Sequence, residues 1–424
     1  MLDIKLIREK PDFIREKLKL RGEDDTIILR MLDIDKKRRE IIKEDESLKE
    51  LRNKVSDQIA VMKKNKENAD EKISEMKQVS SEIKKLDEEL RKLDAMIDGE
   101  LMFIPNNPND NVPIGKSEAD NVEVKVFDEK KEFDFKVLDH LELGKKLDII
   151  DFDIGAKIAG SGFPFYKGKG ATLERALWNF MLDTHIKNGY IEVLPPILVS
   201  SASMEAAEKI PKFADDMYHI ERDDLYAIPT AEVPLVNIHR DEILRFEGLP
   251  IKYCSFTNCF RREAGSYGKE TKGFLRVHQF NKVELVSFCI PESSYDELEA
   301  MLLDACKILD KLNIHYRIIE LCTGDLGFSA SKCYDIEVWS YAENKWLEAS
   351  SVSNFTDFQS RRGKIRYKKI LKEGKTKTEF VHILNGSGLA TSRLIVSLLE
   401  TYQNKDGHIV VPEVLRKYTG FDII

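Results

Sequence analysis

Three segments concentrate arginine and glutamate beside apolar, strand-like runs. They are Arg261-Arg262-Glu263, Arg276 to Phe280 continuing through Glu284, and Asn385 to Arg393. Arginine binds phosphate oxygens in a bidentate manner and stays protonated. An aromatic ring such as that of Phe280 can stack on a purine, and carboxylates can hold a cation or a substrate ammonium group. These residue types together predict a nucleotide site.

A structural ion pair is the alternative explanation for any single arginine and glutamate in a folded core. The clustering of several such residues favours a binding site without removing that alternative. The first two segments are separated by Ala264–Gly273, a polar loop with three glycines. The sequence contains no G-x-x-x-x-G-K-[ST] motif and no Rossmann fingerprint, so a P-loop or dinucleotide-binding fold is not supported.

The N-terminal part of the chain predicts a long helical hairpin. Glycine, proline and aromatic residues are absent from Glu23 to Asp98, as is typical of long helices. Apolar residues recur at heptad spacing in two stretches. The first is Ile27, Ile34, Ile41, Leu48, Val55 and Met62 with Leu51, and the second is Met76, Val79, Ile83, Leu86, Leu90, Leu93 and Ile97. Because a polar break, Lys63–Asp70, separates them, the two helices should pair as an antiparallel coiled coil.

Heptads specify how helices pair and do not specify a ligand, so a dimerisation or spacer hairpin remains an alternative role for this arm. Its basic and acidic residues nearly balance. Any RNA-binding surface would therefore be a single stripe. The candidate residues are Lys36, Lys37, Arg38, Arg39, Lys63, Lys64 and Lys66.

The remaining elements indicate an α+β fold with three parts. We expect an N-terminal domain at 1–100 with its helical hairpin at about 27–98, a Pro- and Asn-rich linker at 101–123, and a catalytic domain at 124–424. Helices are predicted at 171–186 and 293–312. Strands are predicted at 191–194, 225–228, 282–289, 314–320, 333–339 and 346–350. Since these strands follow one another without strict βαβ alternation, the sheet should be mixed and mainly antiparallel, with flanking helices.

Composition narrows the class of protein further. The chain has 424 residues and a formal net charge of -8, which does not suggest indiscriminate nucleic-acid binding, and we expect no DNA partner. The six cysteines form no C-x-x-C pair, a pattern typical of reduced, buried thiols. No segment approaches the roughly 18 uninterrupted apolar residues of a membrane span. These features predict a cytoplasmic protein with no membrane partner.

Five segments resemble motifs of the class II aminoacyl-tRNA synthetases, in the seryl-tRNA synthetase form. Gly189 to Pro196 resembles motif 1, Phe260 to Glu284 resembles motif 2, and Gly386 to Arg393 resembles motif 3. Two segments resemble the seryl family itself: Thr230-Ala231-Glu232, and Glu348 to Asn354 followed by Asp357 to Arg362. The resemblance covers essentially the whole chain. One departure is Ser392, which stands where motif 3 usually has a third glycine, so the helix start there could be displaced.

The resemblance implies a site for each substrate. Serine would be bound by Thr230, Ala231, Glu232, Glu284 and Ser387. ATP would be bound by Arg261, Arg262, Glu263, Arg276, Val277, Phe280, Glu348, Ala349, Ser350, Ser351 and Arg393. Within that set, Arg261, Arg276 and Arg393 would be the catalytic residues, and Glu348 and Ser351 would ligate Mg²⁺. No side chain would act as a covalent nucleophile.

The implied activity is that of an ATP-dependent serine–tRNA ligase. Serine and ATP would give seryl-adenylate and pyrophosphate, and serine would then pass to the 3′ end of tRNA(Ser), with tRNA(Sec) as a further candidate. The family also implies a homodimer with the motif 1 region at its interface. Two other hypotheses compete: a paralogue that loads a carrier protein, and a coiled-coil scaffold without activity. The long arm argues against the first, and the Arg/Glu clusters argue against the second.

Overall fold

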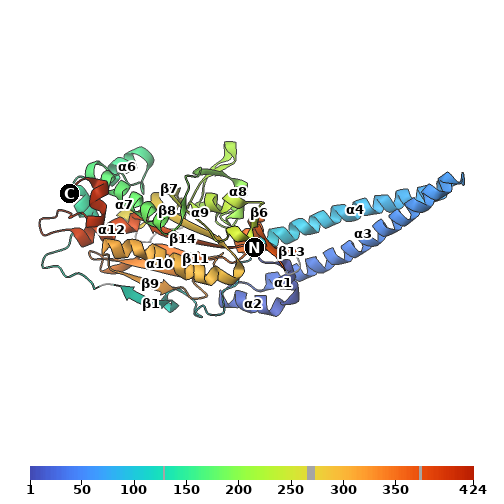
Figure 1. The fold of residues 1–424 in the computed structure, drawn as a ribbon, viewed down its shortest axis with the longest axis horizontal. Helices are drawn as coiled ribbons and strands as arrows, with labels where there is room; N and C mark the ends of the chain where they lie inside the picture. The colour runs from blue at the N-terminus through green and yellow to red at the C-terminus, as the bar shows by residue number, and fades with distance from the viewer. Residues whose placement is uncertain (128, 265–272, 372–374) are drawn as a thin grey trace. The chain divides into compact units, whose positions relative to one another are not determined.

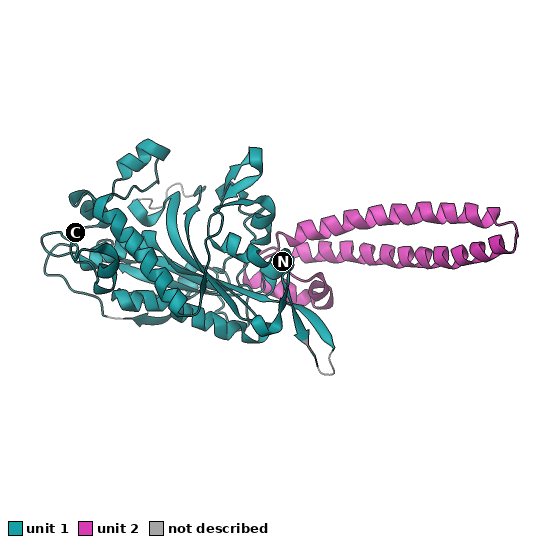
Figure 2. Ribbon diagram, turned by 45° about the horizontal axis from the view of Figure 1, so that its top comes forward, with its two compact units in different colours: residues 1, 106–424 teal, residues 2–105 magenta. Residues whose placement is uncertain are grey.

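The computed structural model describes residues 1–127, 129–264, 273–371 and 375–424. The chain forms two compact units, one of residues 2–105 and one of Met1 with residues 106–424 (Figure 2). Most of the polar loop predicted after Glu263, residues 265–272, lies outside the described residues. The proposed limits of the linker and catalytic domain, 101–123 and 124–424, stay predictions.

The smaller unit contains the predicted helical hairpin. Its helices are α1 (Ile4–Glu9), α2 (Pro11–Leu20), α3 (Thr26–Lys64) and α4 (Asp70–Leu101). The long helices α3 and α4 run antiparallel as a pair and are joined at the polar break after Lys64 (Figure 2). This confirms the helical arm.

The apolar seam of the arm is confirmed on α4 and partly wrong on α3. On α4 the residues Met76, Ile83, Leu86, Leu93 and Ile97 are buried, as the heptads predict. On α3 the predicted Val55 is buried, but the most buried apolar residues, Ile28 and Met31, were not predicted, and the predicted core residue Leu51 is 40% exposed. Two aspartates, Asp35 and Asp45, occupy buried positions of the same helix. A pattern read from apolar residues alone cannot place a seam that includes buried carboxylates.

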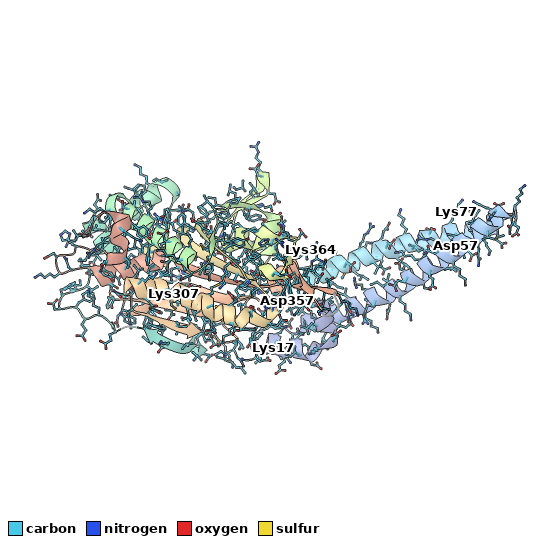
Figure 3. The ribbon with its side chains drawn as sticks, viewed as in Figure 1. Lys17, Asp57, Lys77, Lys307, Asp357 and Lys364 are labelled. Atoms are coloured by element: carbon cyan, nitrogen blue, oxygen red, sulfur yellow. The ribbon has the colours of Figure 1, made fainter. Side chains whose placement is uncertain are left out.

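Charged side chains cover the outside of the arm, where Asp57 and Lys77 are examples (Figure 3). Some of these charges pair between the helices. Nε of Arg38 lies 2.5 Å from a carboxylate oxygen of Asp94. Because Arg38 belongs to the predicted basic stripe, that stripe is partly neutralised by the arm itself.

The larger unit is built on an eight-stranded sheet (Figure 1). In spatial order its strands are β1 (Val122–Phe127), β9 (Tyr316–Glu320), β10 (Lys332–Ser340), β11 (Lys345–Asn354), β14 (His382–Ala390), β8 (Gln279–Cys289), β7 (Ile251–Phe260) and β2 (Ile191–Glu192). All neighbours are antiparallel except β2 and β7, which are parallel. The predicted mixed, mainly antiparallel sheet is confirmed.

Three long helices pack against this sheet: α7 (Gly168–Lys187), α10 (Ser294–Leu312) and α12 (Thr391–Tyr402). Two small three-stranded sheets accompany it. One contains β13 (Thr376–Phe380), β12 (Arg366–Ile370) and β6 (Ile243–Arg245), and the other β3 (Leu198–Ser200), β5 (Leu225–Ala227) and β4 (Tyr218–Ile220). The short helices are α5 (His140–Lys146), α6 (Phe152–Ala159), α8 (Ser201–Ala206), α9 (Glu232–Val236), α11 (Phe358–Gly363) and α13 (Glu413–Thr419). Among the described residues, no helix has the length and apolar character needed to cross a membrane.

Strand β8 shows how the sheet separates core from site. Its residues Val283 and Leu285 belong to the hydrophobic core that α7, α10 and α12 share. Since successive side chains of a strand point to opposite faces, Phe280, Lys282 and Glu284 lie together on the other face. That face is open to the cavity described next.

Candidate active site

A cavity of about 630 Å³ lies over the face of the sheet that carries Phe280, Lys282 and Glu284. Most residues predicted to bind serine or ATP line it. They are Thr230, Glu232, Arg261, Glu263, Arg276, Val277, Phe280, Glu284, Glu348, Ala349, Ser350, Ser351, Ser387 and Arg393. The structure therefore brings together segments more than 160 positions apart in the sequence. The individual binding roles stay predictions.

Two of the predicted residues, Ala231 and Arg262, do not line this cavity. Ala231 is fully buried at the start of α9. The backbone N–H of Arg262 donates to the carbonyl of Asp216 at 2.9 Å, and Asp216 itself lines the cavity. Any contribution of these two residues would therefore act through the backbone and the position of their neighbours.

One end of the cavity holds a fully buried carboxylate, Glu284, in a closed polar network. It forms an ion pair with Lys282 and accepts hydrogen bonds from Thr230 Oγ1 at 2.7 Å and Asn385 Nδ2 at 2.5 Å. Nζ of Lys282 also donates to Thr230 Oγ1 at 2.7 Å. Burial raises the pKa of Glu284, and the Lys282 ammonium opposes that rise.

A second carboxylate at the same end, Glu232, is the first residue of α9. It accepts from Nζ of Lys209 at 2.9 Å and from Nε2 of Gln359 at 2.6 Å. Gln359 also contacts the buried Glu208 at 3.4 Å. The carboxylate of Glu232 is thus held from two sides by residues of α11 and of the segment after α8.

The other end of the cavity is rich in arginine. The guanidinium of Arg261 lies 5.1 Å from the ring centre of Phe280. Nη1 of Arg276 lies 2.8 Å from a carboxylate oxygen of Glu263. Nη1 of Arg393 donates to the carbonyl of Glu348 at 2.7 Å and lies 3.4 Å from its carboxylate. Each arginine is thus held where an anion could replace a protein oxygen.

A bulge in β11 explains how Glu348 and Ser351 reach the same face. They are three positions apart, so a regular strand would turn them to opposite faces. In the pairing with β10, however, Ile336 lies opposite Ser350 and Glu337 lies opposite Glu348, which leaves Ala349 as an extra residue. Asp335 lies directly opposite Ser351, and burial together with the nearby Glu348 raises the pKa of Asp335 well above its ordinary value.

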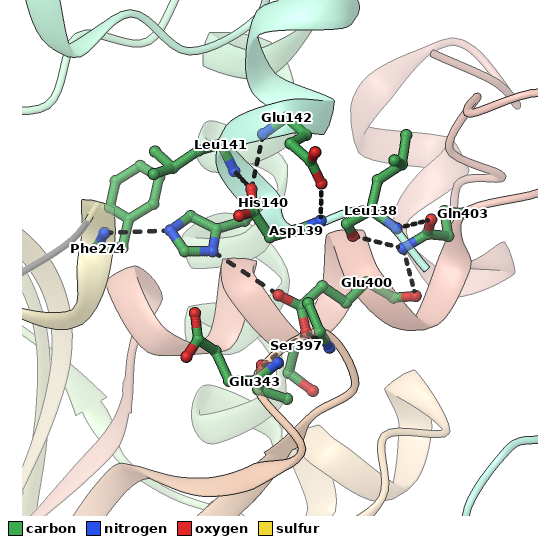
Figure 4. Close-up of polar contacts among 12 residues, drawn as sticks. Leu138, Asp139, His140, Leu141, Glu142, Phe274, Glu343, Ser397, Glu400 and Gln403 are labelled. Carbon is green, nitrogen blue, oxygen red and sulfur yellow. Dashed lines mark hydrogen bonds and ion pairs between the residues drawn. The ribbon is translucent and has the colours of Figure 1, made fainter. Parts of the chain in front are cut away.

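A buried histidine supports the wall of the cavity from behind (Figure 4). His140 at the start of α5 accepts at Nε2 from the backbone N–H of Phe274, at 3.4 Å, and Phe274 lines the cavity. Its Nδ1 lies 3.7 Å from the carboxylate of Glu400 on α12. Gly273 is required here, because its φ is +62° and a Cβ would come 2.2 Å from Nε2 of His140.

Two sequence families match this chain. The model of the "seryl-tRNA synthetase N-terminal domain" matches residues 1–108, and that of the "tRNA synthetase class II core domain (G, H, P, S and T)" matches residues 216–402. A curated relative, the serine–tRNA ligase of Chloroherpeton thalassium, is 56% identical over the full length of both chains. The chain belongs to the seryl-tRNA synthetase family.

Solved structures agree with this membership. A seryl-tRNA synthetase from Pyrococcus horikoshii complexed with ATP superposes with a TM-score of 0.93 and 38% identity, over 100% of this chain and 99% of that one. A cytoplasmic serine–tRNA ligase from Naegleria fowleri in complex with AMP gives a TM-score of 0.89 and 28% identity, over 100% and 98%. As a seryl-tRNA synthetase family member, the chain is an enzyme of the aminoacyl-tRNA ligase class.

The predicted site residues did not include four residues that contact the carboxylates of Glu232 and Glu284: Lys209, Lys282, Gln359 and Asn385. Lys282 could have been found, because it lies two residues from both Phe280 and Glu284 on one strand and therefore shares their face. Gln359 lies in Asp357 to Arg362, a segment that resembles the seryl family, so the resemblance could have found it. Lys209 could not be found, since no motif links it to Glu232. Ser392, which stands where motif 3 usually has a glycine, is the second residue of α12, and this helix begins at Thr391.

Proposed function

We propose that this chain charges tRNA(Ser) with L-serine, using ATP, through seryl-adenylate. The observation that supports it most is that two sets of residues line one cavity. The first set is Thr230, Glu232, Glu284 and Ser387, and the second is Arg261, Arg276 and Arg393. Such a cavity suits a small zwitterionic amino acid joined to a polyphosphate nucleotide.

At the serine end, the carboxylates of Glu232 and Glu284 and the hydroxyls of Thr230 and Ser387 would take the ammonium group and the hydroxyl of the substrate. A buried acceptor that faces a substrate hydroxyl is left unsatisfied by alanine. Discrimination against alanine can therefore be strong, because the penalty falls on the wrong substrate alone.

For ATP binding, Arg276 and Arg393 would exchange their protein carboxylates, Glu263 and Glu348, for phosphate. Arg261 would bind the α-phosphate, while Arg276 and Arg393 would bind the outer phosphates. Glu263 would contact the adenine edge once Arg276 has turned to phosphate, and Phe280 would stack on the ring. The serine carboxylate would attack the α-phosphorus in line and expel pyrophosphate, with positioning and charge neutralisation as the sources of rate acceleration.

The residues of β11 fit Mg²⁺. The bulge at Ala349 turns two hard oxygen donors, the carboxylate of Glu348 and the hydroxyl of Ser351, to one face. No cluster of three or more His, Cys, Asp or Glu among the described residues could hold a metal alone, so the protein would supply few ligands. Such a site suits Mg²⁺, which keeps several water ligands and binds phosphate oxygens. When bound, Mg²⁺ would neutralise the negative charge of the phosphates.

The second step would transfer serine to the terminal ribose of tRNA(Ser), with tRNA(Sec) as a further candidate. We propose that the α3–α4 arm recognises the tRNA by its shape, since its charges nearly balance. We also propose a homodimer with the motif 1 region at its interface. Ile191 in β2 and Leu194 after it are 55% and 88% exposed, and a partner subunit would cover them.

Amino-acid-dependent exchange of labelled pyrophosphate into ATP tests the first step directly. The assay would run across all amino acids, with alanine and threonine as the close competitors. We expect exchange with serine alone. Exchange with another amino acid and not with serine would reject the proposed substrate.

A further inference from the structure

A short stretch of this acidic chain is strongly basic. Between Arg361 and Lys377 the sequence has nine Lys and Arg residues and one Glu, whereas the whole chain carries a net charge of -8. The stretch begins in the last turn of α11, includes β12 and ends in β13, and these two strands form a three-stranded sheet with β6 (β6 and β13 in Figure 1; Lys364 in Figure 3). None of the predicted site residues lies in it.

The inner face of this small sheet uses its lysines for internal ion pairs. Tyr367 is fully buried, which identifies the face that packs on the body. On the same face of β12, Lys369 lies 2.6 Å from a carboxylate oxygen of Glu292. Opposite it on β13, Lys377 lies 2.8 Å from Glu379, which also accepts from the Tyr367 hydroxyl. These cations have structural partners.

The outer face is different. By alternation it carries Arg366 and Lys368 of β12, and the pairing with β6 places Arg245 directly beside Lys368. Arg245 and Lys368 are exposed and form no ion pair with another described residue. Arg366 is half-buried, and its buried Nε atom has no hydrogen-bond partner among the described residues. Since like charges side by side on neighbouring strands destabilise a sheet, an external anion would relieve this arrangement.

The geometry points to this outer face as a contact for the phosphate backbone of an RNA, which we infer to be the tRNA that the neighbouring site charges. This inference rests on the proposed function. The face joins Arg245, Arg366 and Lys368 to exposed hydroxyls of Thr376 and Thr378 on β13. Phosphate oxygens are contacted in proteins by these side-chain types, and such contacts position a nucleic acid without reading its sequence.

An RNA backbone fits this surface better than an acidic protein. The cations form a row across adjacent strands with a spacing of about 4.8 Å, and the hydroxyls continue the row on the third strand. The apolar residues beside them are the exposed Ile243 and the half-buried Phe380, which pairs with Arg366 on β13. This apolar area is small, unlike the apolar centre of a protein interface. Repeated anions along a backbone match such a row.

The test uses the full-length protein with the double substitution Arg245→Gln and Lys368→Gln. Binding of a tRNA(Ser) transcript would be measured by fluorescence anisotropy between about 50 and 200 mM salt. We expect binding to weaken roughly ten- to thirtyfold at about 0.15 M salt, and the slope of log K against log salt to fall by about 2. Serine-dependent pyrophosphate exchange needs no tRNA and should not change.

Two controls make the result specific. The pair Lys311→Gln and Lys405→Gln removes the same charge from exposed positions elsewhere and should leave tRNA binding nearly unchanged. The pair Arg245→Lys and Lys368→Arg keeps the charge and should retain affinity and salt slope. Unchanged binding and salt slope in the Arg245→Gln and Lys368→Gln variant would overturn the inference and favour an acidic protein as the partner of this face. Normal pyrophosphate exchange in the same variant would leave the proposed function intact. Absence of serine-dependent exchange in the unmodified protein would instead reject the proposed function.

Discussion

The arm and the catalytic unit both bury acidic side chains, and they satisfy them in different ways. In the arm, Asp35 is held by Nε of Arg8 at 2.9 Å and of Arg39 at 3.0 Å, two cations that stay partly exposed. In the catalytic unit, Glu284 and its lysine are both buried, and the surrounding Thr230 and Asn385 complete the network. Solvent reaches the first arrangement and not the second.

The two kinds of buried carboxylate therefore have different roles. A carboxylate whose partners reach it from the surface fixes how helices pair. Solvent screening keeps the contribution of such an ion pair to stability small. A carboxylate buried with its partners is costly to desolvate, and a fold tolerates that cost most readily where a substrate uses the group. The comparison predicts that the arm and the catalytic unit respond differently to the same kind of change.

Removing the arm should give the largest difference between the two activities, tRNA charging and pyrophosphate exchange. Deletion of residues 30–95 should abolish tRNA charging, because we propose that the arm supplies contacts to the tRNA. Serine-dependent pyrophosphate exchange should persist, since the cavity belongs entirely to the other unit. Both assays would be run on the same preparation. Equal loss of both activities would refute an RNA role for the arm, and retained charging would favour the spacer or dimerisation role.

Within the cavity, Arg393→Ala should lower kcat/KM for pyrophosphate exchange by roughly 10²- to 10³-fold, the usual effect of removing one group that stabilises transition-state charge. The melting temperature should change little, because this guanidinium is partly exposed. Arg416→Ala is the matched control: its ion pair with Asp422 is also partly exposed but does not line the cavity. A non-enzymatic scaffold would be indifferent to both changes.

Acid should destabilise the catalytic unit through His185. Burial lowers the pKa of His185 to about 4, while its Nε2 contacts the carbonyl of Gly388 beside Ser387. The unfolded chain binds a proton below about 6.5, so this group's stabilisation is present above that pH and is lost as pH falls toward 4. The loss is about 3 kcal/mol over that window.

The measurement is thermal unfolding between pH 4 and pH 7, followed by tryptophan fluorescence. All three tryptophans lie in the catalytic unit, and the arm contains no histidine, so the signal reports the unit of interest. The variant His185→Gln should show a flatter dependence on pH. An identical dependence in both proteins would mean that other groups control acid unfolding.

The smallest effect should come from the arm's own buried acid. Asp35→Ala removes the acceptor for Arg8 and Arg39, and should lower the free energy of unfolding by about 1 to 2 kcal/mol, since both cations can still reach water. Asp33→Ala on the exposed side of the same helix is the control and should change it by less than about 0.5 kcal/mol. Pyrophosphate exchange should be normal in both. A larger loss in the control than in Asp35→Ala would contradict the assigned packing.

Much of the fold followed from local pattern. The absence of helix breakers and the heptads predicted α3 and α4 to within a few residues, and the six predicted strands are all present. The seam of α3 did not follow, because Asp35 and Asp45 lie where an apolar residue is expected. The candidate site was predicted largely from its resemblance to motifs, and Lys209, which lies outside those motifs, was not found.

Local pattern is enough to predict which chemical groups are present and which helices and strands carry them, because periodicity and residue type are local properties. Which of these groups meet depends on how the elements pack. The extra residue Ala349 turns Glu348 and Ser351 to one face, and strand pairing sets Arg245 beside Lys368. These outcomes depend on the register between strands distant in sequence, which no local pattern specifies.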